Sequence, residues 1–325
     1  MQPLLTIAIP TYNRPQKLRE LFDSFLEEIV ETNLCKIEVL IFDNSDEKIA
    51  DKNRILFEHD NILYEKNSEN LEYQGNLVKC LSHAKGSFIW VVSDDDEICT
   101  DILPQLLKTL LALKNTKVNC IMLPVLNSDG LGITKVTNTS YYWKCKNGDN
   151  INSLLSKNNI LPFILFSSAI IRNHQNIKDI SFDTSIHFED NDFIQIPLYL
   201  SIIGKGSLHF FEDVVLKYNA TGDIRFNIEN MFNSMLFVIN FYSGLGLITT
   251  NTYKKKNYKM WAGWFLMGKS KLYKVPGISG FRCKLMPYLV ESLSTLNFGL
   301  TLLFFIPGSI LRNCYLIRSK VKKWF

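Results

Sequence analysis

The stretch FIWVVSDDDEI, residues 88–98, decides the fold class of this chain. Its first five residues are apolar, and a short apolar run of this length is typical of a buried strand. The run leads directly into Ser93 and then into three consecutive aspartates, Asp94, Asp95 and Asp96, which we call the acid run. The chain thus places three carboxylates at the point where a buried strand ends.

The segments on either side of this stretch alternate between strand and helix patterns. The expected strands are residues 4–10, 37–42, 62–64, 88–92 and 120–125. Helices are expected from Pro15 to about residue 30, from residue 73 or 74 to residue 84 with Gly86 as the C′ residue, and from 102 to 113. Strands that alternate with helices indicate right-handed βαβ units. We therefore predict an α/β fold with a mostly parallel sheet flanked by helices.

Polar clusters follow three of these strands. They are Thr11, Tyr12 and Asn13 after the first strand, Asp43 and Asn44 after the second, and the acid run after the fourth. In parallel α/β sheets, ligands bind beyond the carboxyl ends of the strands. The three clusters therefore predict one site, of a size that suits a nucleotide.

The acid run favours a divalent metal, Mg²⁺ or Mn²⁺, because hard cations prefer carboxylate oxygens. In extended geometry Asp94 and Asp96 would project to one side as ligands, and Asp95 would project to the other, towards a ribose or acceptor hydroxyl. The alternative is that the acids cap the helix expected at residue 102. One acid would be enough for a cap, and three adjacent acids repel one another without a cation, so we favour the metal.

The sequence resembles the family 2 inverting glycosyltransferases, which have the glycosyltransferase A fold. The matching stretches are TIAIPTYNRPQKL, VLIFDNSD, NSENLEYQGNLVKCLSHAKGSFIWVVSDDDEI and HFEDNDF, in the family's order over about the first 200 residues. The resemblance implies that a nucleotide-sugar donor binds at Pro10, Thr11, Tyr12, Asn13, Asp43, Asn44, Gly75, Asn76, Asp94 and Asp95. It also implies that Asp43 hydrogen-bonds the base, and that the metal is held by Asp96 and Asp94.

The resemblance further implies a catalytic base. An inverting transfer needs a group that takes the proton of the acceptor hydroxyl, and Glu189 and Asp190 in HFEDNDF match the family's base motif. We assign the base role to Asp190 and an acceptor-orienting role to Glu189. The alternative is a cap for the helix that begins near residue 193. A second pair, Glu212 and Asp213, lies in an apolar strand pattern and is interpreted as an edge pair.

The middle of the chain is less regular. Residues 127–150 are expected to form a loop with an edge strand at most, residues 163–172 and 208–218 are strand-like, and residues 193–203 form a helix that stops at Gly204. We predict a catalytic domain over residues 1–223, with a nucleotide-binding half at 1–125 and an acceptor half at 126–223. Residues 224–325 are expected to form a helical, basic C-terminal region.

The charge distribution separates that C-terminal region from the rest. Residues 251–325 hold 14 Lys or Arg and one acid, whereas the other 250 residues hold 22 basic and 31 acidic residues. Aromatic side chains such as Trp261 and Trp264 are interleaved with the lysines, which suits an anionic membrane surface or single-stranded nucleic acid. The acidic remainder of the chain argues against nucleic acid. The apolar run 298–311 is shorter than the roughly 20 residues that span a bilayer.

These patterns together predict an enzyme that transfers a sugar from a nucleotide-sugar to a hydroxyl of a lipid-linked saccharide, in the synthesis of a bacterial surface polysaccharide. The N-terminus shows no secretion signal, so we expect a cytoplasmic protein at the inner face of the cell membrane. Two alternatives remain. A sugar-nucleotide nucleotidyltransferase would need a glycine-rich phosphate loop after the first strand. The segment at that position, IPTYNR, contains no glycine. A non-catalytic, membrane-associated nucleotide-sugar binding protein would not need Asp94, Asp96 and Asp190.

Overall fold

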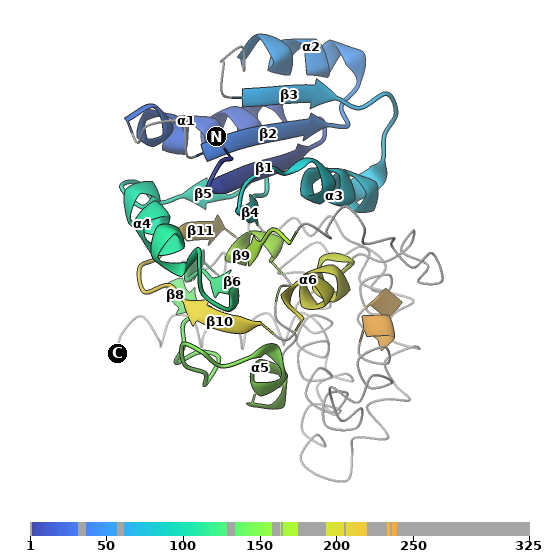
Figure 1. Cartoon of the computed structure of the whole chain (residues 1–325). Helices are drawn as coiled ribbons and strands as arrows, with labels where there is room; N and C mark the ends of the chain where they lie inside the picture. The colour runs from blue at the N-terminus through green and yellow to red at the C-terminus, as the bar shows by residue number, and fades with distance from the viewer. Residues whose placement is uncertain are drawn as a thin grey trace, which may run out of the picture. The chain divides into compact units, whose positions relative to one another are not determined.

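A computed structural model describes residues 2–31, 37–56, 62–128, 134–157, 163, 165–174, 193–204, 206–219, 233–234 and 236–238 (Figure 1). The contacts divide the chain into two units. The first comprises Met1–Ser128, Thr134–Glu189 and Ile194–Asn219, and the second comprises Asp129–Ile133, Asp190–Phe193 and Ala220–Phe325. All the helices and strands named below belong to the first unit, and the predicted domain boundaries stay predictions.

The first unit is built on a seven-stranded sheet. Its order is β10-β6-β9-β4-β1-β2-β3. The strands are β1 (Leu5–Thr11), β2 (Ile37–Asp43), β3 (Ile62–Lys66), β4 (Phe88–Val91), β6 (Val118–Met122), β9 (Ala169–Arg172) and β10 (Ser207–Phe210). All run parallel except β9, which is antiparallel to both β4 and β6. The predicted mostly parallel sheet is confirmed.

The register brings the ends of neighbouring strands together. Thr11 of β1 pairs with Asp43 of β2, and Asp43 pairs with Lys66 of β3. Figure 1 shows β1, β2 and β3 side by side with their arrowheads at the same edge. The polar residues that follow these strands therefore start from adjacent positions.

Helices cover the sheet. They are α1 (Pro15–Glu31), α2 (Glu47–Leu56), α3 (Glu72–His83), α4 (Leu103–Leu113), α5 (Ile151–Lys157) and α6 (Gln195–Ile203). Helix α3 packs on β1, β2 and β4, and α6 packs on β6 and β9. The Tyr73 hydroxyl of α3 donates a hydrogen bond to Oε1 of Gln195 in α6 at 3.2 Å, so these two helices share a face of the sheet.

The main apolar core joins α1 and α4 to the sheet. Leu18 and Phe22 of α1 and Leu106 of α4 are buried in one cluster with Ile7 and Trp90 of β1 and β4. The helical spacing of Leu18 and Phe22 in the sequence predicted α1, because residues three and four apart lie on one face. Helix α1 begins at Pro15, where proline is tolerated because the first helical N–H has no partner within the helix.

A second, four-stranded sheet has the order β5-β11-β7-β8. Its strands are β5 (Glu97–Ile98), β7 (Val125–Ser128), β8 (Thr134–Thr137) and β11 (Leu216–Asn219). The single strands predicted at 120–125 and 208–218 are therefore wrong, because each segment leaves the first sheet and enters the second. The break falls at Pro124, which has no N–H for a ladder, and the Pro124 carbonyl accepts instead from Val215 N at 3.0 Å.

Two further expectations need correction. Helix α2 was not predicted, because its apolar stripe is weak: among the residues from 47 to 54, only Ala50 and Asn53 are buried. Gly86 does not act as a left-handed C′ residue, since Ala84 is the C-cap of α3 and has extended geometry. Gly86 is needed for another reason. A Cβ at this position would lie 2.5 Å from the backbone nitrogen of Thr6.

The predicted stop of α6 at Gly204 is confirmed. Gly204 has φ 51° and its N–H donates to Leu200 O, a conformation that glycine adopts without the strain of a Cβ. In the described part of the chain, no helix is long and apolar enough to cross a membrane. Residues 298–311 and the rest of the basic region 251–325 lie outside the described residues.

Candidate active site

A short loop after β1, formed by Thr11, Tyr12, Asn13 and Arg14 and here called the 11–14 loop, joins the strand ends. Asn13 has a left-handed backbone with φ 52°, a conformation that asparagine tolerates better than most residues. Its backbone N–H donates to Ser45 Oγ at 2.7 Å, and its Oδ1 accepts from Asp46 N at 3.2 Å. The loop is thereby fixed to the residues that follow β2.

The same loop also contacts the acid run after β4. Thr11 Oγ1 donates to Asp94 Oδ2 at 2.8 Å. Arg14 Nη1 donates to Asp94 Oδ1 at 2.7 Å and to Asp95 Oδ2 at 3.0 Å. The three polar clusters that follow β1, β2 and β4 therefore meet at one place, as their positions at strand ends predicted.

The acid run is a turn and not an extended segment. Asp96 N donates to Ser93 O at 3.2 Å, which closes the turn before β5 starts at Glu97. Asp94 and Asp96 are buried, whereas the Asp95 side chain is 46% exposed. The extended geometry that we expected is wrong, because the chain must reverse here to pair β5 with β11.

None of the three acids caps α4. The N-cap of that helix is Ile102, which makes no side-chain capping hydrogen bond, and β5 separates it from the acid run. The alternative interpretation of the acid run as a helix cap is therefore wrong.

Ser167 supports the acid run from the opposite side. It lies in the short 3₁₀ turn η2 (Phe166–Ser168) that precedes β9. Its Oγ accepts from Ser93 N at 3.0 Å, and its hydroxyl is hydrogen-bonded to the carboxylate of Asp96. The Ser167 carbonyl accepts from Trp90 Nε1 at 2.8 Å. This buried serine thus fixes Asp96 relative to β4.

One guanidinium, that of Arg14, only partly balances the three carboxyl groups of the acid run. Burial raises the pKa of Asp96 to about 7, although its hydrogen bond to Ser167 acts in the opposite direction. Burial also raises the pKa of Asp94, even though Arg14 and Thr11 favour its ionised form. For Arg14, burial lowers the pKa, but Asp94 and Asp95 outweigh it and the pKa is raised. Such shifts in buried carboxyls mean that their charge is only partly compensated, which a cation would relieve.

The end of β2 is organised differently. Asp43 is fully buried, and its Oδ1 accepts from Ser45 N at 2.7 Å. Its Oδ2 accepts from Asn53 Nδ2 at 2.8 Å and from the Tyr64 hydroxyl at 2.7 Å. Burial and the neighbouring Asp43 raise the pKa of Tyr64 above its ordinary value. Asp43 therefore ties α2 and β3 to the end of β2.

The side chains of three buried asparagines continue this network. Asn67 Nδ2 donates to Asn44 Oδ1 at 2.7 Å and to Asn76 Oδ1 at 3.2 Å. Asn76 Nδ2 donates to Phe42 O at 2.9 Å. Gly75 lies one residue earlier in α3, where a Cβ would come within 2.9 Å of the Leu71 Cβ. These contacts fix the loop between β3 and α3.

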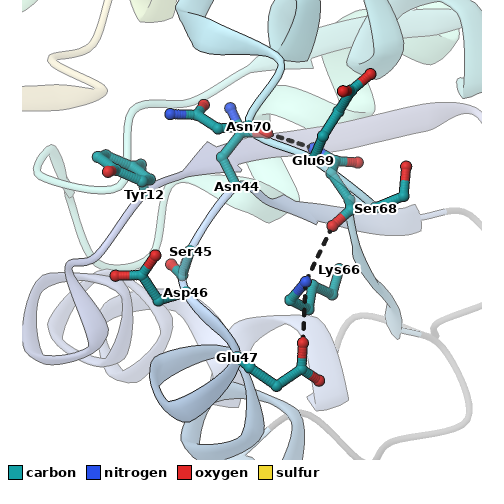
Figure 2. Close-up of a pocket in the computed structure, with 10 residues that line it drawn as sticks. Tyr12, Asn44, Ser45, Asp46, Glu47, Lys66, Ser68, Glu69 and Asn70 are labelled. Atoms are coloured by element: carbon teal, nitrogen blue, oxygen red, sulfur yellow. Dashed lines mark hydrogen bonds and ion pairs between the residues drawn. The ribbon is translucent and has the colours of Figure 1, made fainter.

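A pocket of about 250 Å³ opens at the ends of β2 and β3 (Figure 2). It is lined by Tyr12, Asn44, Ser45, Asp46, Glu47, Lys66, Asn67, Ser68, Glu69 and Asn70. Tyr12 is 49% exposed and presents an aromatic ring beside the pocket. Lys66 Nζ lies 3.1 Å from Glu47 Oε2 across one end. Of the predicted donor contacts, Tyr12 and Asn44 thus line a pocket, whereas Pro10 and Thr11 lie at the end of β1.

The sequence of residues 6–173, more than half of the chain, matches the family described as Glycosyl transferase family 2. The chain belongs to this family. The resemblance that the sequence showed is confirmed.

Individual relatives agree with the family assignment. Abequosyltransferase RfbV of Salmonella typhimurium is 34% identical over 106 residues, which are 31% of this chain and 30% of that protein. The aligned stretch thus spans less than a third of the relative.

Two solved structures share the fold. S. aureus TarS 1-349, solved with UDP-GlcNAc, superposes with a TM-score of 0.51 at 16% identity and covers 74% of this chain and 66% of that one. Mannosyltransferase PcManGT from Pyrobaculum calidifontis, solved with GDP-Man and Mn²⁺, superposes with a TM-score of 0.53 at 13% identity. That match covers 100% of this chain and 88% of the mannosyltransferase chain. At these identities the likeness shows the glycosyltransferase A fold alone.

The acid run of this family 2 chain fits a divalent cation. Within the described ranges, no group of three or more His, Cys, Asp or Glu side chains is placed to hold a metal by itself. Mg²⁺ usually takes only one or two protein carboxylates and keeps water and phosphate oxygens as its other ligands. Asp94 and Asp96 supply two buried carboxyl groups of the kind that this cation takes, so the donor set has the right chemistry.

The predicted base lies outside the described residues. Neither Glu189 nor Asp190 is among them, and both assignments stay predictions. Glu212 and Asp213 are described: they are exposed and lie between β10 and β11, so they do not sit within a strand as expected.

Sequence reasoning missed the roles of Arg14, Tyr64 and Asn53. Arg14 directly follows the predicted polar cluster of Thr11, Tyr12 and Asn13, but the predicted cluster ended at Asn13. Tyr64 and Asn53 gave no local signal, because their partner Asp43 lies 21 and 10 residues away in the chain.

Proposed function

We propose that this chain is a glycosyltransferase that moves a sugar from a nucleoside-diphosphate sugar to a hydroxyl of a saccharide acceptor. The observation that carries the proposal is the 11–14 loop, which joins the acid run after β4 to the residues beside the pocket at β2 and β3. We assign the nucleoside to the pocket, and the diphosphate with its cation to the acid run. Membership of the family supports the same conclusion.

Mg²⁺ or Mn²⁺ would be held by Asp96 and Asp94, with Asp95 at the exposed side of the turn. When bound, the cation would stabilise the diphosphate that leaves with extra negative charge. The protein's own part is to keep two carboxylates buried and oriented through Thr11 and Ser167. The reported Mn²⁺ in the mannosyltransferase from Pyrobaculum calidifontis is consistent with this role.

The transfer is proposed to invert the anomeric centre. In that reaction the acceptor oxygen attacks the anomeric carbon as the bond to the diphosphate breaks, and a base takes the acceptor proton. We assign to Asp190 the role of the base that takes this proton, and to Glu189 the role of orienting the acceptor. Asp190→Asn should reduce turnover and leave the affinity for the donor nearly unchanged, which is the signature of a group that acts only in the transition state.

The acceptor is proposed to be a lipid-linked saccharide of a bacterial surface polysaccharide. Support comes from the basic residues of region 251–325, which suit an anionic membrane surface. The abequosyltransferase relative is by its name a sugar transferase of a bacterium. The chain would then work at the cytoplasmic face of the membrane. The full chain should float with vesicles that contain anionic lipid and not with neutral ones, and replacing Lys320, Lys322 and Lys323 by Gln should weaken that flotation.

The decisive experiment begins with thermal melting in the presence of nucleoside diphosphates with Mn²⁺ or Mg²⁺. A ligand that binds the native state raises its stability by mass action, so the matching nucleotide will give the largest shift. The corresponding nucleotide-sugar is then incubated with the protein and the products are separated. Release of nucleoside diphosphate supports the proposal. Conversion of the nucleotide-sugar to nucleoside triphosphate and sugar 1-phosphate, only when pyrophosphate is added, would instead indicate a nucleotidyltransferase. Binding without turnover would indicate a non-catalytic binding protein.

A further inference from the structure

A single guanidinium nitrogen bridges two aspartates of the acid run. Arg14 Nη1 lies 2.7 Å from Asp94 Oδ1 and 3.0 Å from Asp95 Oδ2. We propose that Arg14 is a built-in counter-ion, which neutralises the acid run when no divalent cation is present and competes with the cation for these oxygens. The inference rests on the proposed function to the extent that the acid run is taken as the metal site.

Burial explains why the acid run needs a counter-ion. The Asp94 side chain is only 5% exposed, and a buried carboxylate without a partner is strongly destabilising. Its second oxygen is occupied by the neutral hydroxyl of Thr11. Within the described residues, Arg14 is the only Lys or Arg in an ion pair with the acid run. It is therefore the group that supplies positive charge in the absence of a metal.

The position of Arg14 explains why it would compete. Nη1 already contacts oxygens of two carboxylates, and a divalent cation at the acid run needs electron pairs of the same kind. Two cations that share one carboxylate also repel each other. The Arg14 side chain is 26% exposed, so it can move away from the acids without disturbing the apolar core. Metal binding then requires Arg14 to release at least one aspartate.

The neighbouring Lys17 gives a matched control. It lies one turn further along α1, carries the same charge, and pairs with Glu20 at 2.7 Å on the exposed surface. Replacing Lys17 by Gln removes one positive charge three residues from Arg14, at a side chain that pairs with Glu20 and not with the acid run. Any effect of Arg14→Gln that exceeds the effect of Lys17→Gln is therefore specific to the bridge.

The test uses the full-length chain and Mn²⁺ alone, with free Mn²⁺ measured by its electron paramagnetic resonance signal. Arg14→Gln should bind Mn²⁺ roughly tenfold more tightly than the wild type, which corresponds to a gain of about 1.4 kcal/mol in the free energy of binding. Arg14→Lys keeps the charge but loses the planar bridge, so its affinity should lie between the two. Lys17→Gln should match the wild type.

Thermal melting provides a second readout that needs no activity. With a chelator present, Arg14→Gln should melt at a lower temperature than Lys17→Gln, because Asp94 has lost its counter-ion. Added Mn²⁺ should then raise the melting temperature of Arg14→Gln more than that of the wild type. If Arg14→Gln cannot be purified in the folded state, Arg14→Lys carries both measurements.

The outcomes separate this inference from the proposed function. Unchanged or weaker Mn²⁺ binding by Arg14→Gln and Arg14→Lys overturns the counter-ion role, and would mean that Arg14 orients the acids for the metal. Failure of the wild type to release a nucleoside diphosphate from any nucleotide-sugar overturns the proposed function and leaves the Mn²⁺ comparison standing.

Discussion

The ends of two strands that flank β1 carry buried aspartates with different surroundings. At the end of β2, Asp43 accepts hydrogen bonds from three neutral donors that belong to the protein itself. At the end of β4, Asp94 and Asp96 stay partly uncompensated, and burial raises their pKa values. The comparison teaches that a carboxylate saturated by neutral donors of the fold holds structure, whereas adjacent acids that share one guanidinium can bind a further cation.

The largest expected effect tests the β4 end. Asp96→Asn keeps the size of the side chain but removes a charged oxygen ligand. We expect transfer to fall by roughly a hundredfold or more, since a bound metal stabilises a transition state by several kcal/mol, and Mn²⁺-dependent nucleotide binding to be lost. Circular dichroism should show an intact fold. Glu97→Gln, one residue later and exposed, is the control and should keep normal turnover. Full activity of Asp96→Asn with chelator present would show that the metal assignment is wrong.

The next effect tests the β2 end through stability. Asp43→Ala leaves the donors from Ser45, Asn53 and Tyr64 without their acceptor. Each buried donor left unsatisfied costs about 1–3 kcal/mol, so we expect the free energy of unfolding to drop by roughly 3 kcal/mol in urea titrations. Asp51→Ala removes an exposed carboxylate that pairs with Arg54 at 3.3 Å and should change stability little. A stable Asp43→Ala variant that has only lost nucleotide binding would make Asp43 a ligand contact instead.

A smaller effect tests the support of Asp96. Ser167→Ala removes the hydroxyl that holds both Ser93 N and the Asp96 carboxylate. Substituting a group that orients a metal ligand typically weakens metal binding about 10-fold or more, and we expect such a loss in Mn²⁺ titrations. Ser168→Ala is the matched control, because the Ser168 hydroxyl donates to Leu165 O at 2.6 Å and, among the described residues, has no bond to the acid run. Equal Mn²⁺ affinities for the two variants would remove Ser167 from the site.

The smallest effect separates the hydrogen bonds around Asp43. Tyr64→Phe deletes one donor to Asp43 Oδ2 and leaves those from Ser45 and Asn53 in place. We expect a loss of about 1 kcal/mol in the free energy of unfolding and unchanged Mn²⁺ affinity. Tyr141 is 92% exposed, so Tyr141→Phe should change neither the free energy of unfolding nor the Mn²⁺ affinity. A change of Mn²⁺ affinity in Tyr64→Phe would mean that the two strand ends are coupled.

The sequence by itself determined the parts that depend on local pattern. The spacing of Leu18, Leu21 and Phe22 predicted α1, and short apolar runs predicted the parallel strands that end at Thr11, Asp43 and the acid run. Because such strands share one edge, their polar ends were expected to meet, and the bonds from Thr11 and Asn13 show that they do. The spacing of apolar residues and the order of strands and helices along the chain depend on residues close in sequence, so both can be recognised without the fold.

Only the tertiary structure decided how each carboxylate is used. The sequence placed both Asp43 and Asp94 at the end of a buried strand, but it did not show which groups of the fold would surround each one. Their difference comes from partners such as Asn53, Tyr64 and Arg14, which lie 10, 21 and 80 residues away from the carboxylates they contact. The tertiary structure also decided that the acid run is a turn, because the antiparallel pairing of β5 with β11 reverses the chain there. Hydrogen bonds and ion pairs between distant segments set the charge balance of a site, and a one-dimensional pattern does not contain them.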